Sequence, residues 1–240
     1  MTRRPLLVIL NPRNIEACMD AFAELHIDKA YVRGYTEAEI AADAWDRVMA
    51  MKWADPISIV SDDTIVTQRA VSTVLALHSM YPRWCVTGWC PLAEGHDLCN
   101  LSRNKLPEGP PNEGSYDFLT CDEARADRGG QLISSSFAGM ALTTMSRELW
   151  ERFPFDVYGG QNGWGFASDY HLSYRLQQAG VSIVSHRDAE IRHVKKTWNE
   201  PDPTPGRELL VGKITRQVLH TAPFPGIDVP LQRKYAETAA

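Results

Sequence analysis

In the first third of the chain, short apolar runs alternate with longer segments whose apolar residues have helical spacing. Residues 6–10 are continuously apolar, and the run stops at the turn-forming residues 11–14, which is the pattern of a buried strand. Residues 15–25 have the composition of a helix, and residues 29–35 have that of a second strand. The chain therefore opens with a β-α-β unit.

A further helix, a third strand and another helix follow. Residues 36–39 resemble a capping box, and residues 40–53 continue with apolar side chains at helical spacing. Residues 56–60 form a third apolar run that ends at two acidic residues, and residues 66–80 are again helical. Three strand–helix units before residue 80 predict an α/β fold with a mostly parallel central sheet and helices on both faces.

The second half of the chain is less regular. Residues 84–89 indicate one further strand, but residues 91–130 are rich in proline, glycine and acidic residues and show little periodicity. We expect a long variable loop region there, of the kind that often forms lids or binding loops. The pattern then predicts helices at residues 146–153 and 169–179, a strand at residues 181–184 and a short extended segment at residues 191–194.

Length and composition limit the number of domains. With 240 residues, of which 44% are hydrophobic and 23% charged, the chain can bury one sizeable core. We expect one catalytic domain over residues 1–200 and a proline-rich extension over residues 201–240 that holds one helix. The formal net charge of -5 supplies no overall basic field for nucleic acid.

Neither the N-terminal residues nor the cysteines indicate export. The apolar run at residues 6–10 is far shorter than a signal-peptide core or a membrane span, and 5 cysteines are an odd number without a secretory signal. We therefore expect a cytoplasmic protein with reduced thiols and no membrane span. Three cysteines at positions 85, 90 and 99 lie near His96, but the Cys-x-x-Cys spacing of a structural zinc site is missing.

Two acidic residues directly follow the third apolar run. Asp62 and Asp63 come after Ser61 at the carboxyl end of a predicted strand, with no basic residue beside them. Carboxylates in such a position suit Mg²⁺ or Mn²⁺, which share their remaining coordination positions with phosphates and water. An acidic pair in front of a helix is also a common N-cap. The pair alone therefore leaves both interpretations open.

A glycine-rich loop and a histidine are the other candidate groups. Gly163, Trp164 and Gly165 stand in a loop shortly before Asp169; glycines permit close backbone approach, and the indole offers a flat surface. Asp169 is placed to act as a general base or to complement the dipole of the following helix. His193, beyond the last strand, is of a residue type that completes metal sites with carboxylates.

The acidic pair, the glycine-rich loop with Asp169, and His193 follow one another in an order that resembles the motifs of glycosyltransferases with the fold called GT-A. The resemblance is greatest to the inverting, family-2-like nucleotide-sugar transferases. In that family an apolar strand ends in an Asp-x-Asp-like motif, here residues 61–63, and a Gly-Trp-Gly-Phe-like loop leads to a Glu-Asp pair, here Ser168 and Asp169. A metal-binding histidine often follows a later strand, and His193 matches that position. The resemblance covers roughly residues 6–195 and implies a single Rossmann-like GT-A domain.

The resemblance also implies a role for each group. Asp63 and His193 would hold Mn²⁺ or Mg²⁺ against the diphosphate of a UDP- or GDP-sugar, and Asp169 would take the proton of the attacking acceptor hydroxyl, with inversion at the anomeric carbon. The loop at the end of the first strand and the metal motif would bind the donor through Asn11, Pro12, Arg13, Asp62 and Asp63. The glycine-rich loop would contact substrate through Gly163, Trp164 and Gly165.

The chain departs from the family pattern at two positions. Ser61 replaces the first acid of the Asp-x-Asp motif, which makes Asp63 the expected metal ligand and Asp62 a sugar or ribose contact. Ser168 replaces the glutamate that often precedes the base. Residues 91–130 and the C-terminal extension would bind the acceptor. The acceptor classes left open are a glycan, a lipid-linked sugar, a protein, a small molecule and a modified nucleobase.

Three other functions stay open at the level of the sequence. A retaining GT-A enzyme differs in stereochemistry, and no second carboxylate stands out as its nucleophile. A nucleotidyltransferase also uses paired carboxylates and a metal, but residues 11–14 contain no glycine for its usual phosphate loop. A non-catalytic glycan-binding module would bind sugar without metal-dependent hydrolysis of a donor.

Overall fold

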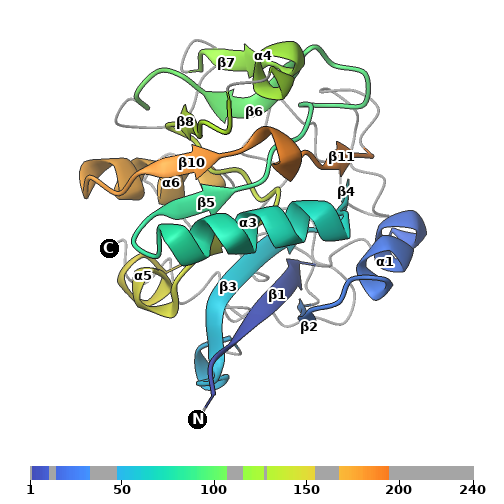
Figure 1. The fold of residues 1–240 in the computed structure, drawn as a ribbon, viewed down its shortest axis with the longest axis vertical. Helices are drawn as coiled ribbons and strands as arrows, with labels where there is room; N and C mark the ends of the chain where they lie inside the picture. Colours follow the sequence, from blue (N-terminus) through green and yellow to red (C-terminus); the bar gives the residue numbers. More distant parts are fainter. Residues whose placement is uncertain are drawn as a thin grey trace, which may run out of the picture.

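A mixed β-sheet forms the centre of the protein (Figure 1). The computed structural model describes residues 2–10, 15–32, 48–106, 116–126, 129–154 and 168–194. Within these residues the main sheet has seven strands. In chain order they are β1 (Arg4–Leu10), β2 (Asp28–Val32), β3 (Ala54–Ser61), β5 (Cys85–Thr87), β8 (Ile133–Ser135), β9 (Thr143–Met145) and β10 (Ile183–Ser185).

The strand order across this sheet is β2-β1-β3-β9-β5-β10-β8. β1 runs parallel to β2 and β3, and β5 runs parallel to β10. β9 is antiparallel to both β3 and β5, and β8 is antiparallel to β10. Five strands therefore point the same way, and β8 and β9 oppose them, which confirms the predicted mostly parallel sheet.

Helices and smaller strands surround the sheet. β4 (Thr64–Ile65) pairs with β11 (Arg192–His193), and β6 (Leu98–Ser102) pairs with β7 (Phe118–Thr120). The helical segments are α1 (Glu16–Ala23), α3 (Gln68–Met80), α4 (Cys121–Arg125), α5 (Arg147–Arg152), α6 (Ser168–Gln178) and the short 3-10 helix η1 (Arg187–Ala189). Among the described residues, no helix has both the length and the apolar character needed to cross a membrane.

The two faces of the sheet bury different helices. Leu7 and Ile9 of β1 pack into a core with side chains of α1 and α3, whereas Leu6 and Val8 pack into a second core with side chains of α5 and α6. Figure 1 shows α3 crossing one face, with α6 behind β10. Because β1 is covered on both faces, its sequence is a continuous apolar run rather than an alternating one. The predicted helices on both faces are therefore confirmed.

Side-chain caps define where three of the helices begin. The Thr67 hydroxyl accepts the N–H of the third residue of α3, and the Ser146 hydroxyl does the same for α5. Thr120 and Glu123 form a reciprocal capping box at α4. Such caps satisfy backbone N–H groups that the helix itself leaves free. The helices predicted at residues 66–80 and 146–153 are confirmed at these positions.

Residues 91–130 contain more secondary structure than the sequence indicated. β6, β7 and α4 lie in this region, and Cys99, Leu101, Leu119 and Ala124 are buried there. Each of these elements has at most five residues, which is too short to establish a recognisable period. Figure 1 shows the three elements together at the top of the molecule, next to β8.

Some sequence predictions lie outside the described residues. These include the proline-rich extension with its helix, parts of the 91–130 region at residues 107–115 and 127–128, and most of the helix predicted before β3. Residues 48–50, at the end of that predicted helix, are helical. The domain limits at residues 1–200 and 201–240 therefore stay predictions.

A half-buried arginine joins α5 to the chain before β3. Arg147 keeps only 11% of its side chain exposed. Its guanidinium donates to the carbonyl oxygens of Val48 and Ala54 at 3.1 Å each, and also to that of Met51. The guanidinium of Arg147 in α5 thus satisfies these three carbonyl groups in residues 48–54.

We expect Arg147→Met to lower the free energy of unfolding by about 2–3 kcal/mol, because buried carbonyl groups lose a charged donor. Chemical denaturation at neutral pH measures this change. Arg83→Met, at an exposed position, is the matched control and should change stability by less than about 0.5 kcal/mol. Equal effects of the two substitutions would show that the carbonyl contacts of Arg147 contribute nothing.

Candidate functional site

The strand order reverses beside β1. From β1 the chain passes to β2 on one side and then returns to β3 on the other side. In open α/β sheets, ligands bind outside the carboxyl ends of the strands at such a reversal. The N–H of Asp62 donates to the carbonyl oxygen of Leu10 at 3.0 Å, which joins the carboxyl ends of β3 and β1. Asp62 and Asp63 therefore lie where this class of fold binds ligands.

A small β-ribbon brings His193 to this edge. β4 and β11 are antiparallel, with His193 opposite Thr64, and the N–H of Val194 donates to the carbonyl oxygen of Asp63 at 2.9 Å. Nε2 of His193 lies 3.3 Å from Oδ2 of Asp63, and both side chains are 15% exposed. The ribbon thus joins two residues that are 130 positions apart in the chain.

The other ring nitrogen of His193 determines what its Nε2 can do. Nδ1 lies 3.1 Å from the carbonyl oxygen of Pro91. A carbonyl oxygen only accepts hydrogen bonds, so Nδ1 carries a proton and donates. In the neutral imidazole, Nε2 then presents a lone pair to the carboxylate of Asp63, which also only accepts. A second proton, on the ring or on the carboxyl group, or a cation shared by the two groups relieves this opposition.

The Asp63–His193 pair fits one divalent cation. Two ligands at about 2.1 Å from an octahedral ion lie about 3 Å apart, close to the 3.3 Å between Oδ2 and Nε2. A metal-ligating histidine usually donates its other N–H to a carbonyl or carboxylate oxygen, as His193 does to Pro91. In the part of the chain that the structure describes, no group of three or more histidine, cysteine or acidic side chains could hold a metal ion.

The remaining residues predicted to bind the donor are only partly described. The side chain of Asp62 is fully buried at the end of β3, and Thr64 donates its hydroxyl to the carbonyl oxygen of Ser61 at 2.8 Å, which stabilises the turn after the strand. The predicted loop residues Asn11, Pro12 and Arg13 follow Leu10 directly but lie outside the described residues. Their roles stay predictions.

Asp169 occupies the first turn of α6. Its Oδ1 accepts the N–H of Tyr170 at 2.8 Å. Burial raises the pKa of Asp169 to about 6, against the opposing effect of this hydrogen bond. A carboxylate that titrates near neutral pH suits proton transfer better than an ordinary aspartate does. Gly163, Trp164 and Gly165, expected beside it, lie outside the described residues.

An aromatic cluster beside Asp169 was not anticipated from the sequence. The ring of Tyr116 stacks on Phe118 with centroids 4.7 Å apart and meets Phe137 and Tyr170 edge-on at 5.7 and 5.9 Å. Burial raises the pKa of Tyr116, and the charge of Asp169 raises it further. The two aromatic residues near position 117 were visible in the sequence, but their partners come from distant segments.

The cysteines are buried and are not joined by disulfides. All five lie in the part of the chain that the structure describes. Burial raises the pKa of Cys99 to about 11 and raises that of Cys85 and Cys90 as well. Thiols in such surroundings are poor nucleophiles and poor metal ligands, because both functions require the thiolate.

Comparisons with known proteins concern the fold alone. Neither the protein-family models nor the curated protein sequences match this chain. A solved structure of A197 from STIV is similar over 81% of this chain and 95% of that chain, with a TM-score of 0.51 and 11% sequence identity. A structure of GalNAc-T7 with UDP, GalNAc and Mn²⁺ is similar over 84% of this chain and 40% of that chain, with a TM-score of 0.48 and 14% identity. The first likeness shows a shared fold, whereas the second is too loose to carry an argument.

The raised pKa of Asp169 predicts a pH-dependent stability. Between 3.8 and about 6, the folded protein holds a proton on Asp169 that the unfolded chain has lost, so this group makes stability fall as the pH rises through that range. Asp169→Asn removes the charge. We therefore expect its stability relative to the wild type to be greater at pH 7.5 than at pH 4.5.

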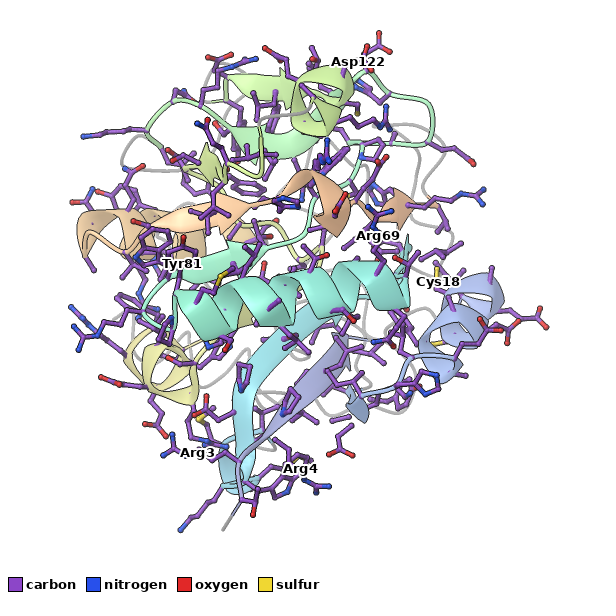
Figure 2. The ribbon with its side chains drawn as sticks, viewed as in Figure 1. Arg3, Arg4, Cys18, Arg69, Tyr81 and Asp122 are labelled. Atoms are coloured by element: carbon purple, nitrogen blue, oxygen red, sulfur yellow. The ribbon has the colours of Figure 1, made fainter. Side chains whose placement is uncertain are left out.

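Chemical denaturation at both pH values measures this difference. Asp122→Asn is the control, because its side chain is 98% exposed on α4, and Figure 2 shows it pointing away from the rest of the protein. The relative stability of this control should be nearly the same at both pH values. The same result for Asp169→Asn would mean that burial does not disfavour the charge of Asp169.

Proposed function

We propose that the chain is a divalent-metal-dependent glycosyltransferase that moves a sugar from a UDP- or GDP-sugar to an acceptor hydroxyl. The opposed Oδ2 of Asp63 and Nε2 of His193, 3.3 Å apart at the reversal of strand order, are the main support. Two such atoms, with the second tied by Nδ1 to a backbone carbonyl, form an incomplete metal site. A diphosphate supplies the oxygens that Mn²⁺ or Mg²⁺ would still need.

Each residue of the metal side has a separate role in this proposal. Asp63 supplies a charged oxygen and His193 a neutral nitrogen, while the carbonyl oxygen of Pro91 holds the imidazole in the required tautomer. When bound, the metal would neutralise charge that develops on the leaving nucleoside diphosphate. Asp62, joined to the end of β1, is assigned to the sugar or ribose of the donor, together with the adjoining loop at residues 11–13.

Asp169 is the proposed general base. It would accept the proton of the acceptor hydroxyl as the hydroxyl oxygen attacks the anomeric carbon, which gives inversion in a single displacement. Its raised pKa allows it to be ionised at neutral pH and still bind a proton during the reaction. Gly163, Trp164 and Gly165, which precede α6 in the chain, are assigned to substrate binding.

The proposal is tested first by ligand binding. A panel of UDP- and GDP-sugars should raise the melting temperature of the wild type in the presence of Mn²⁺ but not in the presence of a chelator, because a ligand that binds the folded state stabilises it. Release of the nucleoside diphosphate should then accompany transfer or slow hydrolysis. Release of pyrophosphate from a nucleoside triphosphate supplied with a sugar 1-phosphate would favour a nucleotidyltransferase, and metal-independent glycan binding without turnover would favour a binding module.

Substitutions at the metal pair should differ in severity. We expect Asp63→Ala to abolish Mn²⁺-dependent binding of UDP or GDP, and His193→Ala to weaken it less, because a neutral ligand is lost rather than a charged one. Titration calorimetry ranks the two. Asp122→Ala and His26→Ala, both at exposed positions, should bind like the wild type. Unchanged binding by Asp63→Ala would remove the metal assignment.

Asp169→Asn separates chemistry from binding. We expect kcat to fall at least about a hundredfold, since general-base catalysis typically contributes ~10²–10⁴-fold. Affinity for the donor and metal should stay nearly unchanged, because the base acts only when the acceptor hydroxyl loses its proton. Steady-state kinetics and calorimetry on the same preparation measure both quantities. A near-normal kcat would rule out Asp169 as the base.

A further inference from the structure

Residues 137–142 connect the metal side of the site to the helix that carries Asp169. At one end of this segment, the N–H of Ala138 donates to Oγ of Ser173 in α6 at 2.9 Å. Two residues later, the carbonyl oxygen of Met140 accepts the N–H of Ser61 at the end of β3, also at 2.9 Å. One short segment therefore contacts both halves of the candidate site.

The hydroxyl of Ser173 is the link on the helical side. It accepts from Ala138 and donates to the carbonyl oxygen of Asp169 at 2.6 Å, and Ser173 is fully buried. A helical serine commonly bonds to the carbonyl group four residues earlier, and this bond alone would stay within α6. The second bond makes the same oxygen atom a bridge between the first turn of α6 and the segment at residues 137–142.

The segment itself is closely packed. Leu142 has a positive φ of 66°, which is uncommon and costly for a residue with a side chain, yet it is fully buried and its carbonyl oxygen accepts the N–H of Gly88 at 3.1 Å. A Cβ atom on Gly139 would lie 2.7 Å from Nδ2 of Asn100, and one on Gly88 would lie 2.5 Å from the carbonyl oxygen of Ala141. Neighbouring side-chain and backbone atoms therefore leave little space around the segment.

We infer that Ser173 is a positioning residue, which sets the location of the Asp169 carboxylate relative to the Asp63–His193 pair. It acts through the rigid segment rather than by touching substrate. The inference deepens the proposed function, on which it depends for the role of Asp169 as the base. The hydrogen-bonded path runs from Ser61 through residues 137–142 to Ser173 and Asp169.

The test compares Ser173→Ala with a matched substitution. Ser58→Ala also removes a fully buried serine hydroxyl, one that lies 2.8 Å from Oγ1 of Thr144 within the sheet. We expect Ser173→Ala to lower kcat about tenfold or more with unchanged affinity for UDP or GDP and Mn²⁺. Ser58→Ala should keep kcat within about twofold, and Ser173→Thr, which retains a hydroxyl, should restore most of the lost kcat.

A second measurement needs no turnover. ¹³C NMR titration of Asp169 should give a midpoint that falls by about 0.5 pH unit or more toward the ordinary aspartate value in Ser173→Ala, because a less firmly held carboxylate becomes better hydrated. Ser58→Ala should leave this midpoint unchanged. If the wild type transfers no sugar, the proposed function fails, and the titration alone decides the role of Ser173. A folded Ser173→Ala protein with an unchanged midpoint, and with unchanged kcat where the wild type is active, would overturn the inference.

Discussion

Two backbone hydrogen bonds at the carboxyl end of β3 hold the acidic pair in place. Ser61 donates to Met140 and Asp62 donates to Leu10, so the strand end is tied on one side to the segment before β9 and on the other to β1. Side chains alternate along a strand, and a shift of one residue would exchange the two faces of β3. Ile57 and Ile59 pack on one face of β3, and Ser58 contacts Thr144 on the other, which favours one register and with it the position of the acidic pair.

The two halves of the site differ in their surroundings. Asp63 and His193 meet at the edge of the sheet, each with part of its side chain open to solvent. Asp169 is the neighbour of Tyr170 in the aromatic cluster, and burial favours its protonated form. Under the proposed function, the partly exposed pair would bind the cation and the buried carboxyl group would accept the proton. The site owes this difference to the helices and loops around it rather than to the residue types themselves.

The sequence predicted secondary structure best in long elements whose apolar residues follow a single pattern. The apolar run of β1 and the helical spacing of α3 predicted their positions, and the order of the acidic pair, Asp169 and His193 suggested a common site. That His193 meets Asp63 was implied by the family resemblance and not by the residue pattern, because β4 and β11 have two residues each and establish no pattern. The roles of Pro91 and Ser173 depend on a carbonyl group and a buried hydroxyl, which have no signature in a single sequence.

The placement of β9 between β3 and β5 has a consequence for the order in which the protein can form during synthesis. β1, β2 and β3 can pair with one another once the chain up to Ser61 has left the ribosome, but both neighbours of β5 in the sheet, β9 and β10, come later in the chain. Thr87 of β5 waits for Thr143, which is 56 residues further on. β5 is buried in the folded protein, but until β9 is made it has no neighbouring strand. Such exposed segments are where nascent chains associate wrongly. Chaperone binding to the emerging chain is therefore most useful between the synthesis of β5 and that of β9.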